Sequence, residues 1–136
     1  MQRKIINPSS LMEPIGYSHG ILVEGGRLLF LAGQDASDIE GKIVGQGDIC
    51  AQFEQILRNL KAVVEEAGGR MQDIVKLTIY VRNRNDYLNK LERFGPLFRS
   101  HFGDYYPALS FFEVRYFFKE EALIELEGFA VISNDW

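Results

Sequence analysis

The sequence predicts an α+β fold, in which a mixed β-sheet carries two helices on one of its faces. Three observations lead to this prediction. An apolar run bounded by glycines, residues 27–32, is typical of a buried strand. Apolar residues then recur at spacings of three and four, first over residues 49–67 and again over 88–102, as in amphipathic helices. Strand-like patterns lie between and after these helices, and packing both helices on one face of a sheet buries the apolar residues economically.

The first strand and the first helix have clear boundaries. The run RLLFLA follows Gly25-Gly26 and precedes Gly33, which predicts a short buried strand. Asp48 can accept hydrogen bonds from the first free amides of the helix, and Gly68-Gly69 can end it. The apolar stripe of this helix consists of Ile49, Phe53, Ile56, Leu57, Leu60, Val63, Val64 and Ala67.

The middle of the chain predicts a strand and a second helix. Residues 74–81, IVKLTIYV, alternate between apolar and polar side chains, as a strand does. The second helix is expected to begin near Asn85 or Asp86, and Gly103 is expected to end it. Pro96 lacks an amide proton, so it should kink or restart this helix.

The last two strands are expected to form an antiparallel hairpin, residues 106–118 and 122–132, with a turn at 119–121. One face, with Phe112, Val114, Ile124, Leu126 and Ala130, is expected to meet the helices. Six apolar residues then point away from the helices: Leu109, Phe111, Phe117, Leu123, Phe129 and Val131. Because monomers rarely expose so large an apolar patch, we expect copies of the same chain to cover this face. The alternative is that the N-terminal segment folds over it.

Acidic residues on the last strand are candidates for chemistry. Glu125 and Glu127 are two residues apart and share one face, and paired carboxylates can divide acid and base roles. Polar residues also alternate outward on ordinary strands, which is the alternative interpretation. A hairpin register centred near residue 120 would place Arg115 opposite Glu125 and Glu113 opposite Glu127. The Arg115 guanidinium would then hold Glu125 ionised.

Composition limits the function classes. The 136 residues, 46% hydrophobic and 25% charged, fit a single globular domain over residues 1–136. One cysteine, Cys50, excludes an intrachain disulfide, and no signal peptide or membrane-spanning run is visible, so we expect a cytoplasmic protein without a membrane partner. A net charge of −4 with scattered Lys and Arg argues against nucleic acid as a partner. The two histidines, His19 and His101, show no metal-ligand spacing.

Six segments follow one another from about Gly16 to Val131: IGYSHGI, LLFLAGQ, GDICAQFEQILRNLKAVVEEAGG, DIVKLTIYVRNRNDY, YPALSFFEV and ALIELEGFAV. In this order they resemble the RidA/YjgF family of reactive-intermediate deaminases. The resemblance implies a chorismate-mutase-like fold that assembles as a homotrimer with a central barrel and three clefts between subunits. It also implies hydrolysis of small enamines and imines without a metal or cofactor.

The resemblance carries site residues over position by position. The Glu that positions water or transfers a proton falls on Glu125, and the Tyr that lines the cleft falls on Tyr17. The backbone that the family's Gly-Gln pair contributes falls on Gly33-Gln34. Three pocket positions depart from the family pattern. Leu109 replaces the Arg that grips a substrate carboxylate, Leu91 replaces an Asn, and Phe111 replaces a small residue.

These departures predict a changed substrate. A guanidinium binds a carboxylate through two parallel charge-assisted hydrogen bonds, which a leucine cannot make. We therefore expect a branch of the family that hydrolyses, or at least binds, a neutral or more apolar enamine, imine or carbonyl compound. The competing hypothesis is a non-catalytic homotrimer that binds or senses a small ligand in the same clefts. Ribonuclease activity, which some family members are credited with, is disfavoured by the net charge.

Overall fold

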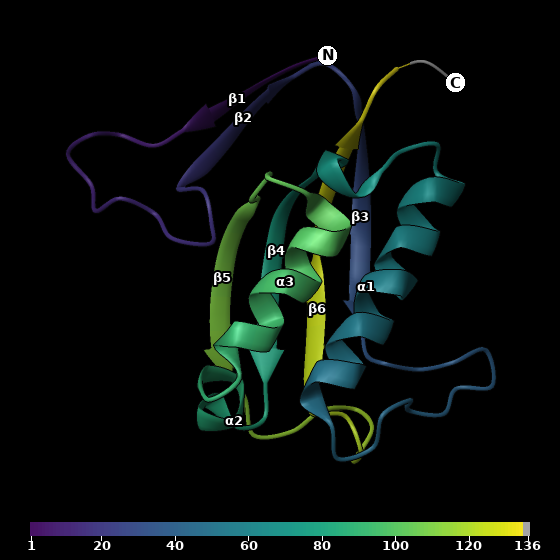
Figure 1. Cartoon of the computed structure of the whole chain (residues 1–136). Helices are drawn as coiled ribbons and strands as arrows, with labels where there is room; N and C mark the ends of the chain where they lie inside the picture. The colour runs from purple at the N-terminus through teal and green to yellow at the C-terminus, as the bar shows by residue number, and fades with distance from the viewer. Residues whose placement is uncertain (135–136) are drawn as a thin grey trace.

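A four-stranded mixed sheet with helices on one face forms the body of the chain in the computed structural model, which describes residues 1–134 (Figure 1). The strands lie in the order β3-β6-β4-β5. Their bounds are β3 Arg27–Gln34, β4 Ile74–Val81, β5 Ala108–Glu113 and β6 Ile124–Ile132. Helices α1 (Ile49–Glu66) and α3 (Leu91–Phe102) lie side by side in front of this sheet (Figure 1). The predicted α+β class, with a mixed sheet and two long helices on one face, is confirmed.

Helix α1 begins and ends where the sequence predicts. The Asp48 carboxylate accepts hydrogen bonds from the amides of Cys50 (3.0 Å) and Ala51 (3.1 Å), which satisfies two of the free donors at the helix start. The helix ends at Ala67, just before Gly68, whose positive φ of 89° suits glycine.

The second predicted helix is divided, but not at its proline. A short helix α2 (Arg84–Leu88) is capped by the Asn83 side chain, and α3 starts after a break at Asn89-Lys90. Pro96 lies inside α3 without ending it. A short 3-10 turn, η1 (Met71–Asp73), connects the end of α1 to β4.

The predicted hairpin between the last two strands is wrong. Strand β5 pairs in parallel with β4, and β4 lies between β5 and β6. The β4 pairing places Leu109 beside Leu77 and Phe111 beside Ile79, whose side chains are buried under the helices. Leu109 and Phe111 therefore face the helices rather than the open face, and the face assignment for β5 was reversed. The assignment for β6 is correct, because Leu126 is fully buried there.

The core lies between the sheet and the two long helices. Its largest fully buried side chains include Phe53, Leu57 and Leu60 of α1, Phe102 of α3, Leu77 of β4 and Leu126 of β6. The other face of the sheet is uncovered within residues 1–134. Leu28 (58%), Phe30 (69%), Phe112 (53%) and Phe129 (41%) keep large exposed fractions there. The N-terminal segment therefore does not bury the open face. The alternative in which this segment of the same chain covers the apolar face is wrong.

The N-terminal strands form a separate arm. Strands β1 (Gln2–Ile6) and β2 (Gly20–Glu24) pair antiparallel and extend away from the body (Figure 1). The loop between them returns to the start of β5, where the Ser18 amide donates to the Pro107 carbonyl (3.0 Å). This contact fixes the position of Tyr17 beside β5. None of the helices in residues 1–134 is long and apolar enough to cross a membrane.

Candidate active site

The predicted site residues form two separate groups within one chain. Glu125 and Gly33 lie together on the open face, where β6 meets β3. Tyr17, Leu109 and Phe111 line a hollow at the outer edge strand β5, and Leu91 lines a neighbouring hollow. The two groups are therefore at different edges of the sheet.

Glu125 packs directly on the backbone of Gly33. A Cβ atom built on Gly33 would lie 2.4 Å from Oε2 of Glu125, closer than any real contact. The strand pairing of β3 with β6 shifts register between Leu31 and Gln34, so Gly33 lies in this irregularity. A side chain at position 33 would therefore displace the carboxyl group of Glu125, and the missing side chain of glycine leaves room for this group.

The surroundings of Glu125 favour its protonated form. Partial burial is the main cause that raises the pKa of Glu125, and the nearby carboxylates of Asp35 and Glu127 raise it further. The hypothesis that Arg115 holds Glu125 ionised is wrong. Arg115 follows β5 in an exposed loop, where its guanidinium lies 5.3 Å from the Tyr116 ring centre. A carboxyl group with a raised pKa is suited to exchange protons near neutral pH.

A hydrogen bond beside Glu125 was not expected from the sequence. Tyr80 of β4 lies opposite Glu125 in the strand register, and its hydroxyl donates to Oε1 of Glu127 at 2.5 Å. This bond to Glu127 is the first cause that raises the pKa of Tyr80. The sequence signal was the alternation in IVKLTIYV, which places Tyr80 on the open face. Glu113, which the sequence predicted to lie opposite Glu127, instead accepts a hydrogen bond from the Arg84 amide (2.8 Å).

The hollow at β5 is mainly apolar and has a volume of about 440 Å³. The ring centre of Phe111 lies 4.6 Å from that of Tyr87 in α2, so the two rings close one wall. Leu109 occupies the floor beside the buried Ile79. The remaining lining residues are Ile15, Gly16, Tyr17, Arg84, Leu88 and Ser110.

Leu91 lies in a neighbouring hollow that shares Leu109 with the first. This second hollow has a volume of about 370 Å³ and lies between α3 and the start of β5. Its walls are Phe94 and Phe98 of α3 and Tyr106 before β5. The three positions that depart from the family pattern, Leu91, Leu109 and Phe111, therefore lie in one continuous apolar region.

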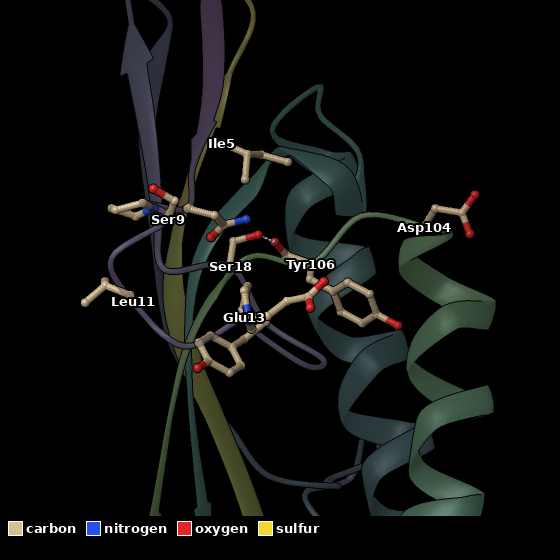
Figure 2. Close-up of a pocket in the computed structure, with 11 residues that line it drawn as sticks. Ile5, Ser9, Leu11, Glu13, Ser18, Asp104 and Tyr106 are labelled. Atoms are coloured by element: carbon tan, nitrogen blue, oxygen red, sulfur yellow. Dashed lines mark hydrogen bonds between the residues drawn. The ribbon is translucent and has the colours of Figure 1, made fainter.

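A third hollow, of about 550 Å³, lies beside the loop that carries Tyr17 (Figure 2). Ser9, Glu13 and Asp104 line it together with the apolar Ile5 and Leu11. The hydroxyl of Ser18 donates to the Tyr106 carbonyl at 2.6 Å across this hollow. The hydrogen bond secures the loop to the segment before β5 and thereby holds Tyr17 in place.

The remaining candidates do not form a site. Cys50 is buried, and burial raises the pKa of its thiol, which fits a packed thiol rather than a reactive one. Within residues 1–134, no three His, Cys, Asp or Glu residues gather as a metal-binding group.

The raised pKa of Glu125 predicts a pH-dependent stability. The folded state holds the proton more tightly than the unfolded chain, so this group's contribution is fully present below the ordinary Glu pKa of about 4.3. The contribution is lost as the pH rises through the folded-state pKa. We expect Glu125→Gln to be more stable than the wild type at neutral pH, with the difference vanishing near pH 4. Urea unfolding at both pH values measures it, and a difference that grows toward low pH would contradict the prediction.

Comparisons with known proteins place the chain in a family. The family model described as endoribonuclease L-PSP matches residues 9–132. A RutC family protein from Pyrococcus abyssi is 36% identical over 131 residues, which cover 96% of this chain and 98% of that protein. A 2-iminobutanoate/2-iminopropanoate deaminase from Salmonella typhimurium is 36% identical and covers 80% of this chain and 83% of its own length.

A solved structure agrees with these relatives. The crystal structure of YyfB from Yersinia pestis, a protein of unknown function of the conserved Rid protein family, superposes with a TM-score of 0.87. It is 36% identical, and the match covers 97% of this chain and all of that one. Sequence and fold thus agree over nearly the whole length. The chain belongs to the RidA/YjgF family.

Proposed function

We propose that the protein hydrolyses a small enamine or imine other than a 2-imino acid, in clefts between the subunits of a homotrimer. One observation carries the proposal: the partly buried Glu125 carboxyl packs on the Gly33 backbone and has a raised pKa. The family includes named 2-iminobutanoate/2-iminopropanoate deaminases, which supports imine hydrolysis as the reaction class.

The positions of the two groups of site residues support the proposed assembly. Glu125 and Gly33 lie near the β3 edge of the sheet, whereas Tyr17 and Leu109 lie at the β5 edge. A head-to-tail contact that joins the β5 edge of one copy to the β3 side of the next would bring the two groups together. Such head-to-tail contacts form a closed ring where the rotation between neighbouring copies closes, and a ring of three would complete three sites. The ring also covers the exposed Leu28, Phe30 and Phe129 of the open face.

The proposed reaction needs one group that moves a proton. Water attacks the C=N carbon of the imine, and ionised Glu125 accepts one proton of the water and passes it to the nitrogen, which gives a neutral carbinolamine. Glu125 then accepts the proton of the carbinolamine hydroxyl and donates it to the nitrogen as the C–N bond breaks, so that ammonia leaves and a carbonyl product remains. A carboxyl group with a raised pKa is suited to both transfers. An enamine enters the same sequence after its carbon is protonated to give the imine.

Tyr17 and the backbone around Gly33 would orient the substrate. The Tyr17 hydroxyl can hydrogen-bond the nitrogen or the developing hydroxyl group, and backbone groups of the β3 irregularity can do so from the other subunit. We expect neither a metal nor another cofactor to take part. We also expect no RNA partner, since the net charge is −4, and no membrane partner, since no apolar run is long enough for a membrane span.

Leu109 sets which substrates are excluded. A substrate carboxylate beside the C=N carbon would lie against Leu109, Ile79 and Phe111, which offer it no hydrogen bond. Losing one side of a buried charge pair typically costs about 2–5 kcal/mol, which is roughly 30-fold or more in affinity. A substrate of this protein should therefore carry hydrogen or an apolar group, rather than a carboxylate, on its C=N carbon.

The test compares Leu109→Arg with the wild type on imines generated in situ from a panel of amino acids and apolar amines. We expect the variant to gain at least about tenfold in kcat/KM on 2-imino acids, because the guanidinium restores two charge-assisted hydrogen bonds. Leu109→Met keeps the volume and serves as the control, with no gain on 2-imino acids.

Two outcomes decide against parts of the proposal. Efficient 2-imino-acid turnover by the wild type would contradict the role of Leu109. If neither protein turns over any imine while both bind an unreactive carbonyl compound tightly, the chain is a ligand-binding homotrimer rather than an enzyme.

A further inference from the structure

We propose that Arg84 binds an acid group of the substrate. Arg84 lies at the α2 end of the hollow at β5 that Tyr17, Leu109 and Phe111 line. The site would then select an enamine or imine whose carboxylate lies several atoms away from the C=N carbon. The inference rests on the proposed function for the chemistry, but its test measures binding and does not need turnover.

The position of Arg84 supports this role. Arg84 is the first residue of α2 and lines the same hollow as Tyr17, Leu109 and Phe111. Every other side chain that lines this hollow is apolar or uncharged. A ligand held there would therefore meet one cationic group, at one end of an apolar surface.

The guanidinium of Arg84 is available for a ligand. The backbone amide of Arg84 donates to Oε2 of Glu113 at 2.8 Å, which fixes the main chain at this point. Its side chain forms no hydrogen bond or ion pair with any residue of 1–134. The carboxylate of Glu113 therefore contacts the main chain of Arg84, and no ion pair between it and the guanidinium is present among residues 1–134. An incoming carboxylate would thus displace only water from Arg84.

The geometry sets how far the acid group lies from the reacting carbon. Arg84 is tied to Glu113, four residues after Leu109 along β5. Four residues of a strand span about 13 Å, and the long arginine side chain reaches back over part of this distance. An acid group bound by Arg84 therefore lies farther along β5 than a carboxylate that contacts Leu109 would. A 2-imino acid is too short to reach it, whereas a chain with two or more carbons between the functional groups is not.

A second arginine lines the neighbouring hollow and must be distinguished. Arg99 of α3 lies beside Leu91 and Gly95, and its Nη1 would be 3.2 Å from a Cβ atom built on Gly95. Its guanidinium is therefore folded back along α3. Because Tyr17 lines the hollow of Arg84 and not that of Arg99, Arg84 is the residue placed for the substrate.

The test measures binding of 4-oxopentanoate and of its uncharged methyl ester by titration calorimetry. These probes share a carbonyl group and differ in the distant acid group. We expect the wild type to bind the acid at least tenfold more tightly than the ester, with the preference shrinking at high salt. Arg84→Gln should lose about tenfold or more in affinity for the acid and keep its affinity for the ester. Arg93→Gln removes an equal charge from α3 outside both hollows and should change neither.

Three results would overturn the assignment. They are equal affinity of the wild type for acid and ester, no measurable binding of the acid, and a loss of acid affinity in Arg99→Gln but not in Arg84→Gln. A failure of the proposed function looks different: the acid binds through Arg84, yet no imine of any chain length is hydrolysed.

Discussion

Glu125→Gln should reduce kcat on every imine that the wild type hydrolyses by about 10²-fold to 10⁴-fold, the usual contribution of one general acid–base group. Glutamine keeps the size of the side chain and its place on Gly33, but it can neither accept a proton from water nor return one to nitrogen. KM should change much less than kcat, because the lost group acts on the reaction rather than on substrate binding.

Glu127→Gln is the matched control for this prediction. Glu127 lies on the same face, two residues away, and its carboxylate is already held by the Tyr80 hydroxyl. Because Glu127 helps to raise the pKa of Glu125, removing its charge should lower that pKa toward the ordinary value. The pH–rate profile should therefore shift its acidic limb to lower pH while keeping most of the maximal rate. Equal losses of kcat in both variants would mean that activity depends on the acidic residues of this sheet face in general, and not on Glu125 in particular.

The sequence predicted most elements because they depend on local signals. The Asp48 cap, the apolar stripe of α1 and the alternation in β4 are each contained within one segment. The strand pairing of β5 is not local. It depends on a crossover through α2 and α3 that makes β5 parallel to β4, and the apolar residues on both sides of β5 gave no sign of which partner it takes. The wrong hairpin then reversed the faces of Leu109 and Phe111.

The candidate site was predictable in its members but not in its geometry. The family motifs pointed to Glu125, Gly33, Tyr17 and Leu109, but the close packing of the Glu125 carboxyl group on Gly33 is visible only in the structure. The electrostatics of Glu125 could not be read from the sequence. They depend on its burial and on Asp35 of the segment after β3, whereas the expected partner Arg115 lies in the exposed loop after β5. Arg84 also gave no signal, because its role depends on the hollow that α2 forms over β5.

Gln52→Met should lower the free energy of unfolding by about 2 kcal/mol or more. Gln52 is fully buried in α1. Its amide donates to the carbonyls of Gly45 (3.2 Å) and Glu121 (3.1 Å), and its oxygen accepts from the Leu123 amide (2.9 Å). Methionine matches the volume but removes the side-chain partner of the Glu121 carbonyl and of the Leu123 amide, each at a cost of about 1–3 kcal/mol when buried. The Gly45 carbonyl still accepts from the Asp48 amide (3.0 Å). Urea unfolding measures the change as a shift of the midpoint at constant slope.

Gln55→Met is the control in the same helix. Among the residues that the structure describes, the Gln55 side chain bonds only Asn59, one turn away, so its replacement should keep the free energy of unfolding within about 0.5 kcal/mol of the wild type. Replacing Gln52 should also loosen the candidate site more than the rest of the fold, because Leu123 immediately precedes the strand that carries Glu125. Amide hydrogen exchange at residues 123–125 should accelerate more than at the centre of α1. If exchange accelerated uniformly instead, Gln52 would stabilise the whole fold without specifically fixing the strand from which Glu125 acts.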